Sequence, residues 1–181
     1  MKIETYRLTL RPFRPDEFGW FHAVLSDPRA MAFSYYGPLQ PEFSAQLFQQ
    51  FQVLQQEKGF SPWAVCNGVT GQFIGLCGIQ EIELNGTPKH EVTFRILPEH
   101  WGNGYGAEAA GAAYRFAFEG LFAEEVVSVI NPQNSHAIAV ATANGLKASS
   151  ETTVDGHSMT VYSQSISDYF QFHGLLGDLA V

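Results

Sequence analysis

Three glycines stand within five residues of the chain, directly before a stretch of strong helix propensity. In the segment ILPEHWGNGYGAEAAGAAYRF they are Gly102, Gly104 and Gly106, and an Ala-rich run follows at once. Glycine loses more backbone entropy on folding than other residues, so such a cluster predicts positive φ angles or the close approach of another group. The start of a helix also presents unpaired N–H groups and the positive end of the helix dipole. This glycine loop, residues 102–106, is therefore either a tight turn or an anion site.

The predicted secondary structure places the glycine loop between a strand and a helix. Polarity alternates with period two over residues 4–13, and Pro15 and Pro41 each open a helix. Asn85-Gly86 and Asp155-Gly156 are two-residue turns of the kind that joins antiparallel strands. The predicted order is βααβββαβαββ, with strands at 4–13, 62–67, 72–84, 90–97, 124–130 and on both sides of Asp155-Gly156, and helices at 15–25, 41–58, 105–119 and 134–144.

This order predicts an α/β (α+β) fold, with a mixed, mostly antiparallel sheet of about seven strands flanked by about four helices. A length of 181 residues suits one domain, and an apolar content of 45%, which includes 15 Phe, can form a sizeable core. No linker or internal repeat interrupts the chain. We expect one domain over residues 1–170 and a C-terminal tail over 171–181.

Charge, cysteine and histidine content limit the expected partners. The formal net charge is −8 and the ten Lys and Arg are dispersed, which argues against a nucleic-acid surface and would attract a cationic substrate. No apolar run approaches the roughly 20 residues that cross a membrane, and the N-terminal segment does not resemble a signal peptide. Cys66 and Cys77 are too few for a disulfide framework, and the histidines lack metal-ligand spacing. We expect a cytoplasmic protein with no metal, membrane or nucleic-acid partner.

Two well-known phosphate loops fit the glycine loop poorly. A P-loop requires Lys and then Ser or Thr after its last glycine, whereas this chain has Ala107-Glu108. Residues 104–109 match the pattern G-x-G-x-x-A of dinucleotide-binding proteins. That motif follows the first strand of a βαβ unit, however, and here an antiparallel meander precedes it. Neither motif explains the segment.

A third family fits better. The segment EVTFRILPEHWGNGYGAEA resembles the acetyl-CoA loop of the GCN5-related N-acetyltransferases, and more narrowly the branch that includes ribosomal-protein N-terminal acetyltransferases. ETYRLTLRPFRPDEF is similar to the opening strand and first helix of that branch, and NPQNSHAIAVATANGLK to a later loop and helix. The resemblance covers roughly residues 4–170, and the predicted element order is that of the family. The matching residues of the first segment are Glu91, Pro98, Trp101, Gly102, Gly104, Tyr105, Gly106, Glu108 and Ala109.

The resemblance implies a site for acetyl-CoA, bound as a co-substrate. Backbone N–H groups from Asn103 to Ala107 would hold its pyrophosphate, and main-chain groups near Phe94 to Leu97 would pair with its pantetheine arm. The glycine loop contains no Lys or Arg, so binding would depend on backbone amides and the helix dipole. The implied cofactor-binding residues are Phe94, Ile96, Leu97, Trp101, Gly102, Asn103, Gly104, Tyr105, Gly106, Ala107, Asn131 and Asn134.

The implied reaction needs a base that takes a proton from an amine. Glu91 is the candidate, because it lies near the start of the strand whose far end leads into the glycine loop. The alternative is a solvated carboxylate at the strand end that pairs with Lys89 or His90. The sequence leaves both interpretations open.

The reaction also needs a proton for the departing thiolate. Many relatives carry a Tyr or a Ser for this purpose, but the corresponding positions here are Ala141 and Ala137. Tyr162, in the last hairpin, is the reserve candidate for the acid. Its alternative role is that of a packing tyrosine at the rim of the sheet.

The acceptor and the activity itself stay open at this stage. Tyr35 and Tyr36 lie between the first two predicted helices, a segment that in this family reaches over the acceptor cleft; core packing is the alternative. The leading function is transfer of an acetyl group from acetyl-CoA to a primary amine by direct attack in a ternary complex. A small-molecule amine or a protein N-terminus would be the acceptor. The alternative is a catalytically inactive, CoA-binding regulatory module. Either a monomer or a homodimer is expected.

Overall fold

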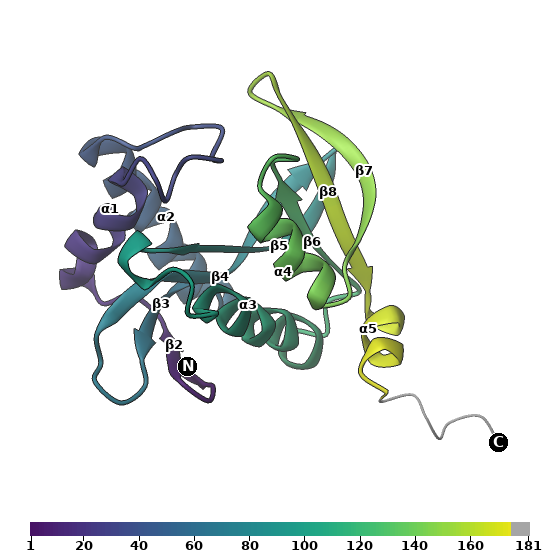
Figure 1. Cartoon of the computed structure of the whole chain (residues 1–181), viewed down its shortest axis with the longest axis horizontal. Coiled ribbons are helices and arrows are strands. Elements are labelled where there is room, and N and C mark those ends of the chain that lie inside the picture. Colours follow the sequence, from purple (N-terminus) through teal and green to yellow (C-terminus); the bar gives the residue numbers. More distant parts are fainter. Residues whose placement is uncertain (175–181) are drawn as a thin grey trace. The chain divides into compact units, whose positions relative to one another are not determined.

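A computed structural model describes residues 1–174 of the chain (Figure 1). The chain divides into two compact units. Unit 1 comprises Met1–Gln80 and Thr93–Ala113, and unit 2 comprises Glu81–Val92 and the chain from Tyr114 onward. Two strands, β4 and β5, pass through both units, so each unit contains part of one continuous pair of strands.

Unit 1 combines antiparallel strands with helices α1 to α3. Strand β2 pairs with β3, and β3 pairs with β4. Pro41 opens α2, and Gly59, with φ +80°, ends it in the left-handed conformation. The elements are β1 (Ile3–Glu4), β2 (Leu8–Arg11), a 3₁₀ turn at Pro15–Glu17, α1 (Phe18–Ser26), α2 (Pro41–Lys58), β3 (Pro62–Asn67), β4 (Phe73–Leu84), β5 (Thr87–Ile96), a 3₁₀ turn at Pro98–His100 and α3 (Tyr105–Arg115).

The predicted strand at residues 4–13 is two short strands instead of one. β1 and β2 pair antiparallel, so the chain reverses over residues 5–7. The Thr5 N–H donates to the Leu8 carbonyl at 2.9 Å and closes this turn. The alternation of polarity continues across the turn, which is why a period-two pattern could not reveal it.

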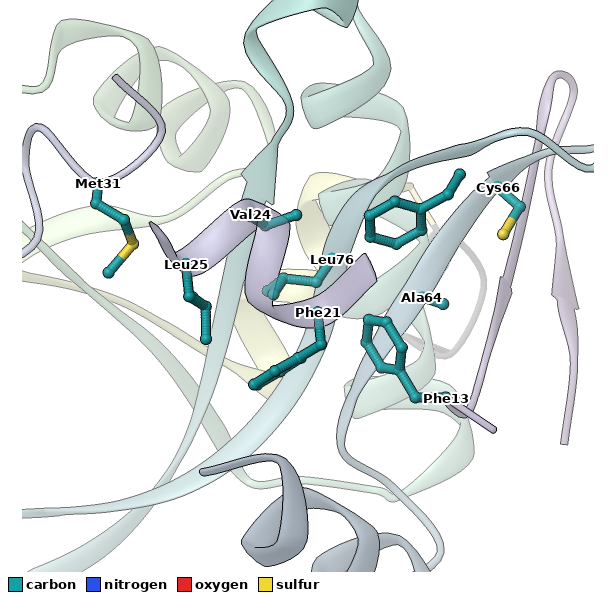
Figure 2. Close-up of a cluster of buried hydrophobic side chains, with 9 residues drawn as sticks. Phe13, Phe21, Val24, Leu25, Met31, Ala64, Cys66 and Leu76 are labelled. Carbon is teal, nitrogen blue, oxygen red and sulfur yellow. The ribbon is translucent and has the colours of Figure 1, made fainter. Parts of the chain in front are cut away.

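A cluster of apolar side chains holds α1 on the sheet of unit 1 (Figure 2). Phe21, Val24 and Leu25 of α1 are all at least 98% buried, and Figure 2 shows them beside Ala64 of β3 and Leu76 of β4. Burial of apolar surface at about 25 cal/mol per Å² makes this contact a main source of stability. The full cluster is Phe13, Phe21, Val24, Leu25, Met31, Ala64, Cys66, Phe73 and Leu76.

Unit 2 is built around β6. This strand runs parallel to β5, with His90 opposite Val126 and Glu91 opposite Val127, and antiparallel to β8. β7 and β8 form a long hairpin that leads into α5 (Figure 1). The elements are a π-helical turn at Phe116–Gly120, β6 (Glu125–Ile130), α4 (Ser135–Ala143), β7 (Lys147–Val154), β8 (His157–Ser165) and α5 (Ile166–Phe172).

The observed topology confirms the predicted fold class. The strand order is β1-β2-β3-β4-β5-β6-β8-β7, a mixed and mostly antiparallel sheet. Over residues 1–174 the structure has eight strands and five α-helices, against about seven and about four expected. The extra strand comes from the division at residues 5–7. None of the helices in this part of the chain is both long and apolar enough to span a bilayer.

The extra helix, α5, was missed although its sequence carries a start signal. The Ser165 side chain accepts a hydrogen bond from the Asp168 N–H at 3.1 Å, as an N-cap residue does. The expected boundary between domain and tail, at residue 170, falls inside this helix. The remainder of the expected tail, residues 175–181, lies outside the described residues.

Candidate functional site

Two of the three glycines in the glycine loop serve a turn. Gly102 has φ +77° and Gly104 has φ +75°, and few other residues adopt this left-handed conformation without strain. The Glu108 N–H donates to the Gly104 carbonyl at 3.1 Å, which begins the hydrogen-bond ladder of α3. The amides of residues 105–107 precede that bond and point out of the helix start. The turn therefore delivers a row of backbone donors.

The third glycine, Gly106, has a different role. A side chain at this position would place its Cβ 3.0 Å from Cε2 of Phe94 and 3.6 Å from Cγ1 of Ile96. The missing side chain thus allows the first turn of α3 to pack directly on β5. The glycine cluster predicted the close approach of another group. At Gly106 that group belongs to the protein itself, because it is the ring of Phe94.

The backbone of β5 has one side committed to β4. The Leu97 N–H donates to the Ile74 carbonyl of β4 at 2.9 Å, and the Leu97 carbonyl accepts from the His100 N–H at 2.9 Å. Successive backbone groups of a strand alternate in direction, so those of Phe94 and Ile96 face away from β4. Among the predicted pantetheine-binding residues, Phe94 thus has suitably directed backbone groups. Ile96 has a suitably directed N–H, but its carbonyl accepts from Trp101 Nε1–H. Both main-chain groups of Leu97 are engaged within unit 1.

Trp101 and Asn103 shape the approach to the glycine loop. The Trp101 Nε1–H donates to the Ile96 carbonyl at 2.7 Å, while the indole remains about half exposed. The Asn103 side chain donates to the carbonyls of His100 and Trp101 at 3.0 and 3.1 Å. Both side chains therefore stabilise the turn, and the backbone amides remain the donors that this segment offers to an anion.

Tyr35 and Tyr36 lie in the turn between α1 and α2 of unit 1, as expected. Their ring centroids are 4.2 Å apart, and the Tyr36 side chain is 62% exposed. Tyr36 is thus a surface residue, and the alternative of a fully core-packed pair does not apply to it.

Glu91, the candidate general base, lies on β5 in unit 2, and its side chain is buried. Its exposed fraction is 9%, and its Oε1 accepts a hydrogen bond from the Val129 N–H at 3.2 Å. Lys89 forms an ion pair with Glu125 instead. The alternative of a solvated strand-end carboxylate was therefore wrong: Glu91 is directed toward β6, where the parallel ladder ends.

Where the backbone pairing of β5 and β6 ends, hydrogen bonds from side chains connect the two strands. Glu91 opposite Val127 is the last pair of the described register, and Glu91 then accepts from Val129. The Ser128 hydroxyl donates to the Val92 carbonyl at 2.7 Å and, because its proton is used there, accepts from the Tyr114 hydroxyl at 2.8 Å. Ser128 was missed from the sequence; its signal is a polar residue within the apolar run EVVSVI.

The remaining predicted residues of unit 2 lie around α4 and β8. Asn134 caps α4, since its Oδ1 accepts from the Ala137 N–H at 3.1 Å. The Asn131 Oδ1 accepts from the Gln133 N–H at 2.9 Å and stabilises the preceding turn. Tyr162 lies on β8, opposite Ser128 in the register, and is partly exposed. Both asparagines thus order the start of α4 whether or not they also bind a ligand.

Comparison with known proteins identifies the family. The acetyltransferase (GNAT) domain model matches residues 7–147, so the chain belongs to this family of acetyl-CoA-dependent N-acetyltransferases. The Bacillus subtilis protein YkkB is 28% identical over 166 residues, which are 90% of this chain and 95% of YkkB. The resemblance seen around the glycine loop is confirmed.

Solved structures share the fold. An acetyltransferase from Agrobacterium tumefaciens superposes with a TM-score of 0.79 at 29% identity, covering 91% of this chain and 94% of the other. A ribosomal-protein-S5-alanine acetyltransferase from Vibrio fischeri has a TM-score of 0.74 at 16% identity, with coverages of 93% and 98%. A spermidine N-acetyltransferase from Vibrio cholerae, solved with CoA and spermine, has a TM-score of 0.73 at 18% identity, with coverages of 92% and 99%. At these last two identities the likeness concerns the fold alone.

Proposed function

We propose that this chain transfers an acetyl group from acetyl-CoA to a primary amine by direct attack, with both substrates bound together. The observation that carries the proposal is the glycine loop. In a chain that belongs to the acetyltransferase family, it places a row of backbone donors at the start of α3. Those donors match the pyrophosphate of acetyl-CoA, an anionic part of this co-substrate.

Acetyl-CoA would be held largely by backbone groups. The amides of residues 103–107 would donate to the pyrophosphate, supported by the positive end of the α3 dipole. The backbone groups of Phe94 and the N–H of Ile96, which face away from β4, would pair with the amides of the pantetheine arm. Asn131 and Asn134 would contribute from the start of α4. The thioester supplies the acetyl group, and no covalent enzyme intermediate is needed.

Glu91 is proposed as the general base. The amine must lose a proton before its lone pair can attack the thioester carbonyl carbon, and a carboxylate can take that proton directly or through a water. The carbon–sulfur bond then breaks and the thiolate accepts a proton, for which Tyr162 is the proposed donor.

The proposed acceptor is a small-molecule amine or a protein N-terminus. A formal net charge of −8 favours the approach of a cationic amine. Tyr36, exposed in the turn between α1 and α2, is proposed to contact the acceptor together with Tyr35. Cys66 and Cys77 are buried free thiols, in keeping with the proposed action in the cytoplasm. A monomer or a homodimer is proposed.

A second function, that of an inactive CoA-binding regulatory module, has its own support. α4 carries Ala137 and Ala141 at the positions where relatives of this kind have a Ser or a Tyr as acid. Glu91 also has a structural contact with Val129, which would preserve it without catalysis. Measurement of acetylated amines by mass spectrometry, after incubation with acetyl-CoA and an amine panel, separates the two functions.

Binding of the cofactor is tested by thermal unfolding. CoA or acetyl-CoA at a hundred times its Kd is expected to stabilise the folded state by about 2.7 kcal/mol, because it binds the native protein only. For a chain of this size that corresponds to roughly 5–10 °C in Tm. NAD and NADP are expected to leave Tm unchanged. A shift with a dinucleotide and none with CoA would contradict the proposed function.

The acid is tested by Tyr162→Phe. If Tyr162 protonates the thiolate, its removal is expected to lower kcat by about 100-fold. The KM for acetyl-CoA is expected to change little. An unaltered kcat would mean that water protonates the thiolate and that Tyr162 is only a packing residue of β8.

A further inference from the structure

Arg7, from the turn between β1 and β2, contacts the glycine loop of unit 1 at several points. Its Nη1 donates to the Asn103 carbonyl at 2.8 Å, and its guanidinium lies over the Tyr105 ring, 4.7 Å from the centroid. Its Nη2 is 3.5 Å from the position that a Cβ of Gly104 would occupy. A cation distant in the sequence thus lies against a loop that contains no Lys or Arg of its own.

The same arginine pairs with a carboxylate in the first turn of α3. The Arg7 Nε donates to Glu108 Oε2 at 2.7 Å, and the Arg7 backbone N–H donates to Glu108 Oε1 at 2.8 Å. The Thr5 hydroxyl donates to the same Oε1 at 2.6 Å. Burial would raise the pKa of Glu108, but these hydrogen bonds outweigh it and hold the pKa below its usual value. Glu108 is therefore a charged carboxylate in the first turn of α3, next to the loop amides.

A carboxylate at this place opposes the binding of an anion. It competes for the positive end of the α3 dipole and repels a second negative group nearby. Arg7 offsets that charge, and its Nη1 also donates to the Asn103 carbonyl of the glycine loop.

We propose that Arg7 is a positioning residue of the anion site: it neutralises Glu108 and fixes the glycine loop so that the loop amides can donate to a diphosphate. The inference rests on the proposed function, in which that diphosphate belongs to acetyl-CoA. Arg7 acts through Glu108, Asn103 and the loop amides.

The test compares Arg7→Ala with Arg11→Ala by calorimetric titration of CoA and, separately, of inorganic pyrophosphate. The control removes a similar pair elsewhere in unit 1, since Arg11 Nη2 lies 2.7 Å from Glu17 Oε1. Arg7→Ala is expected to weaken the binding of both probes by about 10- to 100-fold, the range for losing a charged hydrogen-bonding group. Arg11→Ala is expected to lower Tm but to keep the wild-type Kd values.

A double variant separates electrostatics from simple bracing of the fold. Arg7→Ala combined with Glu108→Gln is expected to bind CoA and pyrophosphate more tightly than Arg7→Ala alone, because the uncompensated charge is gone. Should Arg7→Ala fail to fold, Arg7→Lys serves instead. Lysine keeps the positive charge but lacks the planar guanidinium with its several donors, so this variant is expected to bind both probes less tightly than the wild type.

The outcomes distinguish this inference from the proposed function. Wild-type affinity in the Arg7 variant, equal losses in Arg7→Ala and Arg11→Ala, or no recovery in the double variant would overturn the role of Arg7. A wild-type protein that binds pyrophosphate in an Arg7-dependent way but does not bind CoA would support the role of Arg7 and contradict the proposed function. A wild-type protein that binds neither probe would contradict both.

Discussion

Gly104→Val is expected to weaken CoA binding by about 100-fold or more. At φ +75° a β-branched residue is strained, so the variant must move the backbone that precedes α3. The amides of residues 105–107 then lose their common direction, and losing two hydrogen bonds to a phosphate costs about 1.5–3 kcal/mol each. Titration of CoA into the folded variant measures the loss directly.

Gly71→Val is the matched control for this prediction. Gly71 has φ +73° in the turn between β3 and β4, with open space around the position of its missing Cβ. The substitution introduces the same kind of backbone strain in the same unit, so a similar loss of Tm is expected with CoA affinity unchanged. Equal CoA affinity in the two variants would show that the glycine loop is a turn and not an anion site.

Gly106 is less suitable for this test, although the sequence treats the three glycines alike. A Cβ at Gly106 would lie 3.0 Å from Phe94, so a valine there disturbs the packing of α3 on β5 as well as the loop. A loss of CoA binding in that variant would combine two causes. The distinction comes from the structure, because neither a φ angle nor a tertiary contact can be read from glycine spacing.

Local signals in the sequence predicted most of the fold. Proline starts, glycine stops and the turns at Asn85-Gly86 and Asp155-Gly156 act within a few residues, and positive φ angles at both turns confirm the hairpins. The break in the first strand escaped prediction because Thr5 and Arg7 bond to Glu108, about 100 residues further along the chain. Hydrogen bonds between residues so far apart in the chain produce no periodic pattern in the sequence.

The candidate site, like the fold, was predicted from the sequence only where its signals are local. The glycine loop has a local motif and was located at the start of α3, as the structure has it. Arg7, Ser128 and Tyr114 were missed, since each acts through a contact between elements distant in the sequence. Asn131 and Asn134 were singled out as ligands, and the structure also gives them hydrogen bonds that order the chain before α4.

The same double role makes Glu91 the decisive residue. Its burial and its bond to the Val129 N–H provide a structural reason for a carboxylate at the point where β5 and β6 stop pairing. A buried carboxylate near a functional site is also a frequent general base, because its surroundings can adjust its basicity. The two interpretations predict different behaviour for a side chain that keeps the hydrogen bond and loses the charge.

Glu91→Gln introduces a side chain of this kind. The substitution is expected to lower kcat by about 10²- to 10⁴-fold, the usual contribution of a general base. The glutamine Oε1 can still accept from the Val129 N–H, so Tm and CoA affinity are expected to stay near the wild-type values. Because a base must be deprotonated to act, the activity of the wild type is expected to fall on the acidic side, and in the variant that limb is expected to disappear or shift.

Glu125→Gln is the matched control, since Glu125 is a carboxylate of β6 that pairs with Lys89 in the same unit. It is expected to keep the wild-type kcat and pH profile. Two results would remove Glu91 from the mechanism. Unchanged turnover of Glu91→Gln at every pH would mean that water takes the proton from the amine. A joint loss of Tm and CoA affinity would mean that the carboxylate holds the end of the β5–β6 ladder, and that its role is structural.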